Sequence, residues 1–492
     1  MVVGSNLISA LVALGQGIVL VRLLSKDGYG TWAFVTMVFG TGKDIAALAI
    51  PQSILFFAPK LKPAEVRGLL RQSVSLLTAL GTLTGLVFVG LAIFPSVLPE
   101  GHGPMTRLLL LFCLASVVAL PASAYNTLFI GTQNHRTAAA ISVWISFGTT
   151  IALIIPAALG LPLEWLAGVF AISHALRLAL SHWLFRRLFR GAEVTPFEGG
   201  IRRQLRYAIP LALTRLAGIV NQKLDKFAVG LFFAVATFAE FAVAAQELPL
   251  VSILPYSIAQ AMLPELVSRY QEGTTKEKGA RASIELWHEG IKKASLVMLP
   301  VAAFLLVTAE PLMEVLYGAR YRPAALPFRV YTMLLPLRVT AYGIMLMAFG
   351  ETKQLLRTQI YGMVFNLVGN IVLMYLLGMI GAPIASVLAQ LFMASYILYR
   401  INKTASVGLG GLMPWRHYGL VAVAATLGTA PLVAGVVLLP NAPAALVLVG
   451  GLVLYLATYL VLANAVGAIR DEDRVYLRRW ARLEPFRKQP DE

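Results

Sequence analysis

The sequence predicts an all-α polytopic membrane protein with about fourteen transmembrane helices. Three observations support this: 58% of the 492 residues are hydrophobic and only 13% are charged, long apolar stretches recur along the whole chain, and basic residues avoid every second gap between those stretches. A soluble domain would carry about twice that charge. A stretch of roughly 20 apolar residues spans a bilayer. The stretches lie at about 5–24, 29–57, 72–94, 106–130, 137–160, 164–185, 207–232, 235–266, 290–309, 324–350, 356–377, 379–399, 417–439 and 443–466.

Lysine and arginine mark one side of the membrane. The gaps after stretches 2, 4, 6, 8, 10 and 12, together with the C-terminal tail, hold most of the 41 basic residues. Cytoplasmic loops are enriched in Lys and Arg, so we expect the C-terminus to be cytoplasmic. Topology then accounts for the net charge of +17, and nucleic acid is not expected as a partner. The opposite gaps hold only Arg22, Lys26, Arg107, Arg320, Arg322 and Arg329.

Several classes of protein are not expected. Cys113 is the only cysteine, which excludes a disulfide framework and a thiolate metal cluster. No gap could hold a soluble catalytic domain, since domains rarely fall below roughly 50 residues. The segment from Gly40 to Asp44 lacks the first glycine and the Ser/Thr of a phosphate-binding loop. We therefore expect no enzyme activity, no catalytic residues, no cofactor and no metal site.

A weak internal repeat divides the chain. Residues 29–33, which open stretch 2, resemble residues 238–242 in stretch 8, and residues 131–134, which end stretch 4, correspond to 350–353 at the end of stretch 10. Six stretches per repeat is an even number, so both halves keep the same orientation in the membrane. The expected parts are two pseudo-symmetric six-helix lobes, 1–200 and 201–400, then two further helices in 401–470 and a basic cytoplasmic tail, 471–492.

Two polar segments are expected at the membrane surface. Segment 275–293 predicts an interfacial helix, because Glu277 and Arg281 are spaced i,i+4 and an apolar side accompanies them. The tail 470–488 interleaves arginines with aromatic residues. It would bind anionic membrane lipids or serve as a plain topology anchor.

Charged residues inside the apolar stretches are the candidate site residues, since an ionisable group at mid-membrane persists when it faces water or a partner. Stretch 7 is richest in such residues: Arg215 and Lys226 lie on one helical face, Lys223 lies beside it, and Asp225 pairs in spacing with Asn221. Lys223 and Lys226 could instead extend toward the interface. Cations outnumber anions, which favours an anionic ligand such as a diphosphate. The expected substrate-binding residues are Arg22, Arg177, Arg215, Lys223, Lys226 and Arg338.

Acidic residues and one pair at a helix break are the expected coupling or gating residues. Lys43 and Asp44 interrupt stretch 2 and could simply satisfy one another. In stretch 8 two glutamates are spaced i,i+7. The complete set is Lys43, Asp44, Asp225, Glu240 and Glu247.

Four short segments resemble the signatures of bacterial polysaccharide transporters. They are Val21–Gly30 between stretches 1 and 2, Leu224–Gly230 in stretch 7, Tyr317–Ala324 before stretch 10 and Ile380–Ala385 in stretch 12. In order and spacing they resemble the O-antigen flippase-like branch of the multidrug/oligosaccharidyl-lipid/polysaccharide exporter superfamily. Ser25-Lys26-Asp27 departs from the usual Gly-Pro form of the first signature, which leaves the substrate open. Arg22, Asp225 and Lys226 occupy motif positions.

The resemblance implies two six-helix lobes, a central cationic cavity and alternating access. We expect a flippase that moves an undecaprenyl-diphosphate-linked oligosaccharide across the bacterial inner membrane, with H+ or Na+ as coupling ion and a glycan polymerase or other assembly protein as partner. A peptidoglycan lipid-precursor flippase and a cation or drug antiporter of the same superfamily are the alternatives. An antiporter should have a cavity dominated by acids, whereas basic residues dominate within these stretches.

Overall fold

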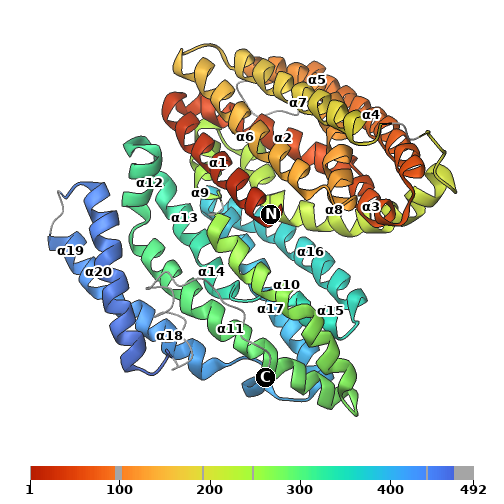
Figure 1. The fold of residues 1–492 in the computed structure, drawn as a ribbon. Helices are drawn as coiled ribbons and strands as arrows, with labels where there is room; N and C mark the ends of the chain where they lie inside the picture. Colours follow the sequence, from red (N-terminus) through yellow and green to blue (C-terminus); the bar gives the residue numbers. More distant parts are fainter. Residues whose placement is uncertain (1, 95–101, 191–192, 247–248, 439–441, 470–492) are drawn as a thin grey trace. The chain divides into compact units, whose positions relative to one another are not determined.

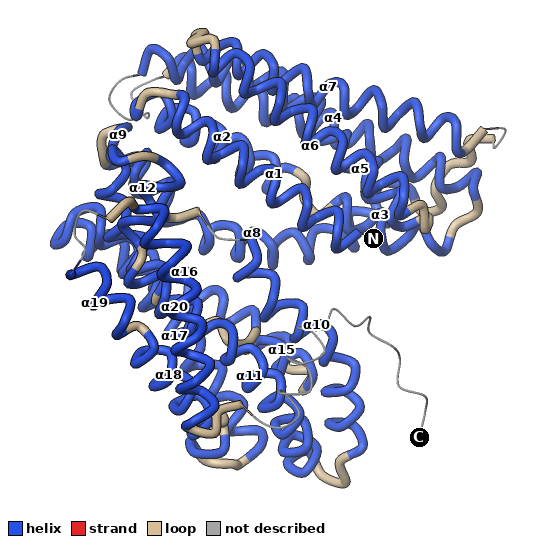
Figure 2. Tube along the Cα trace, turned by 60° about the vertical axis from the view of Figure 1, so that its left-hand side comes forward, coloured by secondary structure: helices blue, strands red, loops and turns tan. Residues whose placement is uncertain are grey.

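The structure, a computed structural model, describes residues 2–94, 102–190, 193–246, 249–438 and 442–469. Within these ranges the regular structure is entirely helical (Figure 2), which confirms the all-α prediction. Each predicted stretch coincides with a helix or with a set of broken helices, and the predicted tail lies outside the described residues. The helices are α1 (Val2–Leu23), α2 (Lys26–Ala46), α3 (Ile50–Phe57), α4 (Pro63–Ile93), α5 (His102–Gly131), α6 (His135–Ala158), α7 (Leu163–Leu188), α8 (Gly200–Phe232), α9 (Val235–Ala244), α10 (Pro249–Glu272), α11 (Lys276–Val307), α12 (Ala309–Tyr317), α13 (Ala325–Thr332), α14 (Leu334–Leu337), α15 (Gly343–Ala348), α16 (Thr352–Leu377), α17 (Gly381–Ala405), α18 (Trp415–Gly428), α19 (Ala430–Leu438) and α20 (Ala444–Ala465).

The protein is a multi-pass membrane protein. Eight helical segments of the described chain are long and apolar enough to cross a bilayer, and the bent pair formed by α2 and the segment Ile50–Lys60 would make a ninth. One of the eight, 352–405, holds two predicted stretches, because α16 and α17 are joined there by a short 3₁₀ turn. The stretches beyond these nine coincide with helices that are short, interrupted or rich in polar residues, such as α1, α8 and α13–α15.

The second predicted stretch is not one straight helix. It breaks between α2 and α3 with a bend of 47°. Leu48 and Ala49 adopt φ values of 44° and 54°, in the left-handed region that L-residues rarely occupy. Pro51 then stands at the first turn of α3, where its missing N–H costs no hydrogen bond. The break directs the chain away from the axis of α2.

The predicted interfacial helix 275–293 is wrong as a separate element. It is the first half of α11, a single helix of 32 residues that continues to Val307. Thr275 caps it by accepting a hydrogen bond from the Lys278 amide, and Glu277 pairs with Arg281 at 2.7 Å as the spacing predicted. Ile284 and Ile291, which suggested a membrane-facing side, are buried against other helices instead.

The helices form two compact units, each with its own core. The described residues of 1–250, 316–331 and 356–393 make unit 1, and those of 251–315, 332–355 and 394–492 make unit 2. The lobe boundaries at 200 and 400 stay a prediction. In unit 1, helices α4, α5, α6 and α7 run side by side (Figure 1), and α3 and the start of α8 pack on α4 and α5. Ile50, Leu69, Leu120, Phe129 and Ala208 are buried in its core.

Gln204 fastens the start of α8 to the helices of the first half. It is fully buried, and its amide nitrogen donates to Ser53 Oγ at 2.9 Å and Ser73 Oγ at 2.8 Å. Its carbonyl oxygen accepts from Gln72 at 2.8 Å. A buried amide with its bonds made fixes neighbouring helices in register. α8 is thereby held against α3 and α4.

Unit 2 packs α11, α14, α18 and α20 around large aromatic side chains. Trp287 is buried on α11, and its Nε1 donates to Thr340 Oγ1 at 2.8 Å. Tyr455 on α20 donates to the carbonyl of Pro300, the position where proline interrupts the hydrogen bonding of α11. Arg400 pairs with Glu351 at 2.7 Å at the ends of α17 and α16.

Candidate functional site

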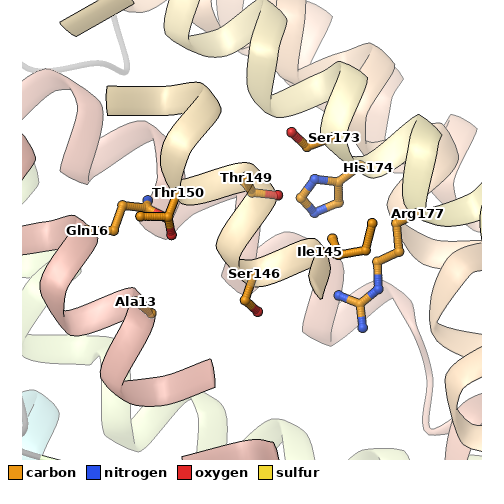
Figure 3. Close-up of a pocket in the computed structure, with 9 residues that line it drawn as sticks. All are labelled: Ala13, Gln16, Ile145, Ser146, Thr149, Thr150, Ser173, His174 and Arg177. Carbon is orange, nitrogen blue, oxygen red and sulfur yellow. The ribbon is translucent and has the colours of Figure 1, made fainter. Parts of the chain in front are cut away.

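A hydrophilic cavity of about 160 Å³ lies within unit 1 between α1, α6 and α7 (Figure 3). α6 contributes Ser146, Thr149 and Thr150, which lie within the largely apolar middle of the helix. Gln16 of α1 reaches toward α6, and Thr150 Oγ1 donates to its Oε1 at 2.9 Å. Polar groups at membrane depth need partners, so a hydrated or ligand-filled cavity is the favourable setting for this group.

α7 supplies the charge of the cavity. Ser173, His174 and Arg177 lie on one side of this helix, since residues three and four apart share a face. His174 Nδ1 lies 3.1 Å from the carbonyl of Phe170 and must donate to it, so in the neutral ring Nε2 is the acceptor. Arg177 is half-buried, and among the described residues no carboxylate pairs with it. The cavity can therefore attract an anion.

Asp225 forms a second polar centre in unit 1, where α8, α13 and α17 meet. Its side chain is 5% exposed, and its Oδ2 accepts hydrogen bonds from Tyr331 Oη and from Ser386 Oγ, the latter at 3.1 Å. Its Oδ1 accepts from the Lys226 amide at 2.7 Å. A carboxylate with only these neutral donors around it can bind a cation or a proton.

A row of amides begins one helical turn from Asp225. Asn366 Nδ2 donates to Asn221 Oδ1 at 3.2 Å, and Asn370 Nδ2 donates to Asn366 Oδ1 at 2.8 Å. Both asparagines of α16 are buried, and no described residue donates a hydrogen bond to the buried oxygen Asn370 Oδ1. A buried acceptor without a donor is costly. It offers a ligand position to a cation or to water.

A third group joins three distant segments of unit 1 around the end of α1. Lys26 of α2 forms a half-buried ion pair with Glu240 of α9. Arg22 Nε donates to the carbonyl of Leu316 at 2.9 Å, and Arg320 donates to the carbonyls of Val21 and Leu24, the latter at 2.6 Å. We call these residues, Arg22, Lys26, Glu240 and Arg320, the clasp. The segments that form the clasp lie in or next to the gaps after stretches 1, 7 and 9. These gaps contain few basic residues.

Gly30 lets α2 approach α9 beside the clasp. A Cβ at this position would lie 2.3 Å from the carbonyl oxygen of Val235, closer than any real contact. Phe34 and Phe238 then meet edge to face with ring centroids 5.5 Å apart. Each of the two repeat segments, 29–33 and 238–242, therefore contributes one residue, Gly30 or Phe238, to the packing of α2 on α9.

The structure distributes the predicted site residues over several places. Arg177 lines the cavity, Asp225 is in the buried centre, and Arg22 and Glu240 are in the clasp. On α8, Arg215 is exposed and Lys223 is half-buried, and neither has an ion-pair partner among the described residues; Lys226 follows Asp225 directly. Lys43 and Asp44 lie 3.8 Å apart near the end of α2. Arg338 caps α14 in unit 2, and Glu247 lies outside the described residues.

The neutral partners of these groups could not be read from the charged positions alone. Tyr331, Ser386, Asn366 and Asn370 were not predicted, although Asn366 and Asn370 are an i,i+4 amide pair within an apolar stretch. Buried amides are costly in a membrane helix without partners, so this spacing was the available signal. Gln16 in stretch 1 was a similar isolated signal.

Several solved structures have the same fold as this chain. A structure of the lipid II flippase MurJ in an inward closed conformation has 12% sequence identity and a TM-score of 0.74, over 94% of this chain and 98% of that one. An inward-facing multidrug resistance MATE family transporter of the MOP superfamily has 16% identity and a TM-score of 0.59, over 81% and 96%. A MOP superfamily transporter from Pyrococcus furiosus has 16% identity and a TM-score of 0.52, over 81% and 95%. The chain therefore shares its fold with these three structures.

The family was found by comparison with family models. A comparison with curated proteins gave no match. The model of the family described as "Polysaccharide biosynthesis protein" matches residues 19–326, which is more than half of the chain and runs from the end of α1 to the start of α13. The range includes Arg177, Asp225 and the clasp. Three of the four segments that resembled polysaccharide transporters lie within the matched range. The chain therefore belongs to this Polysaccharide biosynthesis protein family.

Proposed function

We propose that the protein is a flippase that moves a diphosphate-linked oligosaccharide lipid, of the undecaprenyl type, across the bacterial inner membrane by alternating access. The observation that carries this proposal is Arg177, a half-buried cation in a polar cavity between largely apolar helices, to which the described part of the chain offers no carboxylate partner. The glycan and diphosphate would pass through the hydrophilic interior while the lipid tail stays in the bilayer. The expected orientation places the C-terminus in the cytoplasm, and assembly proteins such as a glycan polymerase would use the product.

The charge balance favours an anionic cargo over a cationic drug. A cation at the centre of a membrane helix costs about 2.5–3.5 kcal/mol on insertion scales. A phosphate group would offset that cost through bidentate hydrogen bonds with the guanidinium. Arg177, Arg215 and Lys223 are the candidates to meet it, whereas Asp225 is the one acidic candidate of α8. A drug or cation antiporter would need acids in the places where these basic residues stand.

Substituting the cavity arginine tests the proposal. Arg177→Gln should reduce export of the lipid-linked glycan at least about tenfold, because one charge-assisted pair is worth about 1.5–3 kcal/mol. Arg215→Gln should also reduce export. Arg202→Gln, an exposed arginine at the start of α8, is the matched control and should export normally. Wild-type export by both Arg177→Gln and Arg215→Gln, at equal abundance in the membrane, would rule out the assigned site.

Asp225 is the proposed coupling residue. A carboxylate bound by two hydroxyl groups suits a proton or a hard monovalent cation such as Na+. In the row of amides nearby, the Asn370 oxygen, which no described residue pairs, fits the same role. Among the described residues, no group of three His, Cys, Asp or Glu side chains could hold a metal ion. A cation at Asp225 would therefore depend on a single charge and neutral oxygens, which gives weak and reversible binding.

The coupling role has a direct test in vesicles. Asp225→Asn should abolish the dependence of transport on an imposed Na+ or proton gradient, because the amide can neither be protonated nor attract a cation. Glu272→Gln, at the exposed end of α10, is the control and should keep that dependence. A gradient response that persists in Asp225→Asn would contradict the assignment. Comparing the two gradients identifies the ion.

A peptidoglycan lipid-precursor flippase remains the second candidate, because the fold match to the lipid II flippase MurJ covers nearly the whole chain. Both cargoes carry a diphosphate, so Arg177 would serve either one. Purified protein in vesicles separates them: we expect faster movement of a lipid-diphosphate oligosaccharide than of lipid II. The reverse preference would favour the second candidate.

A further inference from the structure

Unit 1 contains another hollow, of about 570 Å³, at a distance along α7 from the polar cavity. It is lined by Arg67 of α4, by Trp183, Arg186 and Arg187 of α7, and by Phe189 and Arg190 just after α7. A neighbouring hollow of about 550 Å³ shares Phe189 and Arg190 with it and is lined by the segments after α3 and α5. Arg177 and Arg187 are ten positions apart on α7, which places them about 15 Å apart along the helix axis.

The described residues of the lining carry four positive charges and no acidic side chain. Like charges that converge on one hollow repel each other, and an anion in the hollow would relieve that repulsion. Topology alone does not explain the convergence. The preference for basic residues in cytoplasmic loops requires only that charges lie near the ends of the spans. Here guanidiniums from two helices that are more than 100 positions apart in the sequence surround one space.

The residue types point to phosphate. All four cations are arginines, whose planar guanidinium can hold two oxygens of one phosphate, whereas lysine is a point charge. Arg187 lies over the Trp183 ring, 5.7 Å from its centroid, and 54% of Trp183 is exposed. Tryptophan is enriched at the level of lipid headgroups, where one part of its ring is wet and the other apolar.

We infer that this hollow is a binding site for the phosphate of an acidic phospholipid headgroup in the membrane leaflet on the basic side of the protein. The phosphate would lie between Arg67, Arg186 and Arg190, and Trp183 would lie at the boundary of the acyl chains. The site is separate from the proposed transport cavity and does not depend on the identity of the cargo. A bound lipid would link the start of α4 to the end of α7 and would stabilise unit 1.

Binding can be measured with the purified full-length protein in detergent, by thermal unfolding and native mass spectrometry. The probes are phosphatidylglycerol, phosphatidylcholine and inorganic phosphate. Arg186→Gln with Arg187→Gln removes two charges from the hollow. Arg202→Gln with Arg206→Gln removes two exposed charges from the same gap but outside the hollow, and is the matched control. Arg186→Lys with Arg187→Lys keeps the charge and loses the fork geometry.

We expect phosphatidylglycerol, but not phosphatidylcholine, to raise the unfolding temperature of wild type and of the control. The affinity of the double Gln variant for phosphatidylglycerol should fall about tenfold or more, since at least one charge-assisted pair is lost. The affinity of the double Lys variant should lie between those of the wild type and the double Gln variant. A shift with inorganic phosphate alone, lost in the double Gln variant, would support the phosphate site and identify a free anion as its ligand. An equal loss of phosphatidylglycerol affinity in the double Gln variant and in the control would overturn the inference. Equal affinity of the wild type and the double Lys variant would also overturn it. All the substituted arginines at 186 and 187 are exposed, so folding should survive.

Discussion

Gly30 shows how a single position sets the distance between two helices. The carbonyl of Val235 occupies the space where a side chain would begin, so any residue other than glycine must push α9 away from α2. Gly40, ten positions further along the same helix, has nothing within 4 Å of its Cβ position. The two glycines look alike in sequence, and only the packing distinguishes them.

Gly30→Ala should destabilise the protein, whereas Gly40→Ala should not. At Gly30 the methyl group forces a backbone shift, which typically costs about 1–3 kcal/mol. At Gly40 the alanine reduces the conformational entropy of the unfolded chain and favours the helix. This should stabilise the folded protein by about 0.4–1 kcal/mol. Thermal unfolding of both variants in the same detergent measures the difference. Equal unfolding temperatures would show that α2 and α9 do not approach as closely as described.

At the scale of elements, the sequence predicted where helices lie better than where they bend. The run 29–57 is mostly apolar, its only charged residues are Lys43 and Asp44, and neither glycine nor proline stands at positions 47–49, where the helix breaks. Pro51 was the available signal, because proline favours the first turn of a new helix. α11 shows the opposite error: charged pairs at 277–289 suggested a separate surface helix, but the buried side of that segment continues into the membrane span.

The break between α2 and α3 should respond to glycine. Ala49 has φ 54°, and Ala49→Gly removes the steric cost of the left-handed conformation, roughly 1 kcal/mol. The neighbouring Ala47 has φ −62°, so Ala47→Gly only adds chain entropy to the unfolded state and should destabilise by about 0.5–1 kcal/mol. The unfolding temperature in detergent should therefore rise for Ala49→Gly and fall for Ala47→Gly. Destabilisation by both would show that the left-handed turn is absent.

At the scale of the whole chain, the alternation of basic gaps matches the contacts within unit 1. The clasp joins segments next to the gaps after stretches 1, 7 and 9, which are poor in basic residues. The hollow at Phe189 joins segments after stretches 2, 4 and 6, most of which are rich in them. The distribution of Lys and Arg among the gaps could predict which gaps lie together at one end of the helices. It could not predict partners such as Tyr331 and Ser386 for Asp225. Those depend on which helix faces meet, and hydrophobicity alone leaves that open.

Cysteine labelling tests the predicted orientation. In a Cys113→Ala background, Asp27→Cys in the clasp region should react with a membrane-impermeant maleimide added outside the cell, since Asp27 is exposed at the start of α2. His135→Cys, exposed at the start of α6, should react only after the membrane is opened. The opposite labelling pattern would invert the topology. Reaction of both from outside would contradict the alternation itself.

Arg320 holds the last carbonyls of α1, and this has a mechanical consequence. Gln16 is six residues before Arg22 on the same helix, about 9 Å along its axis, and a helix of this length moves as a stiff rod. Any cargo that displaces Gln16 would also strain the hydrogen bonds at the far end of α1. These are the bonds from Arg320 to the last carbonyls of the helix and from Arg22 to the Leu316 carbonyl. Binding in the cavity would in this way change the clasp through a displacement of α1 as a whole, without a relay of intermediate side chains.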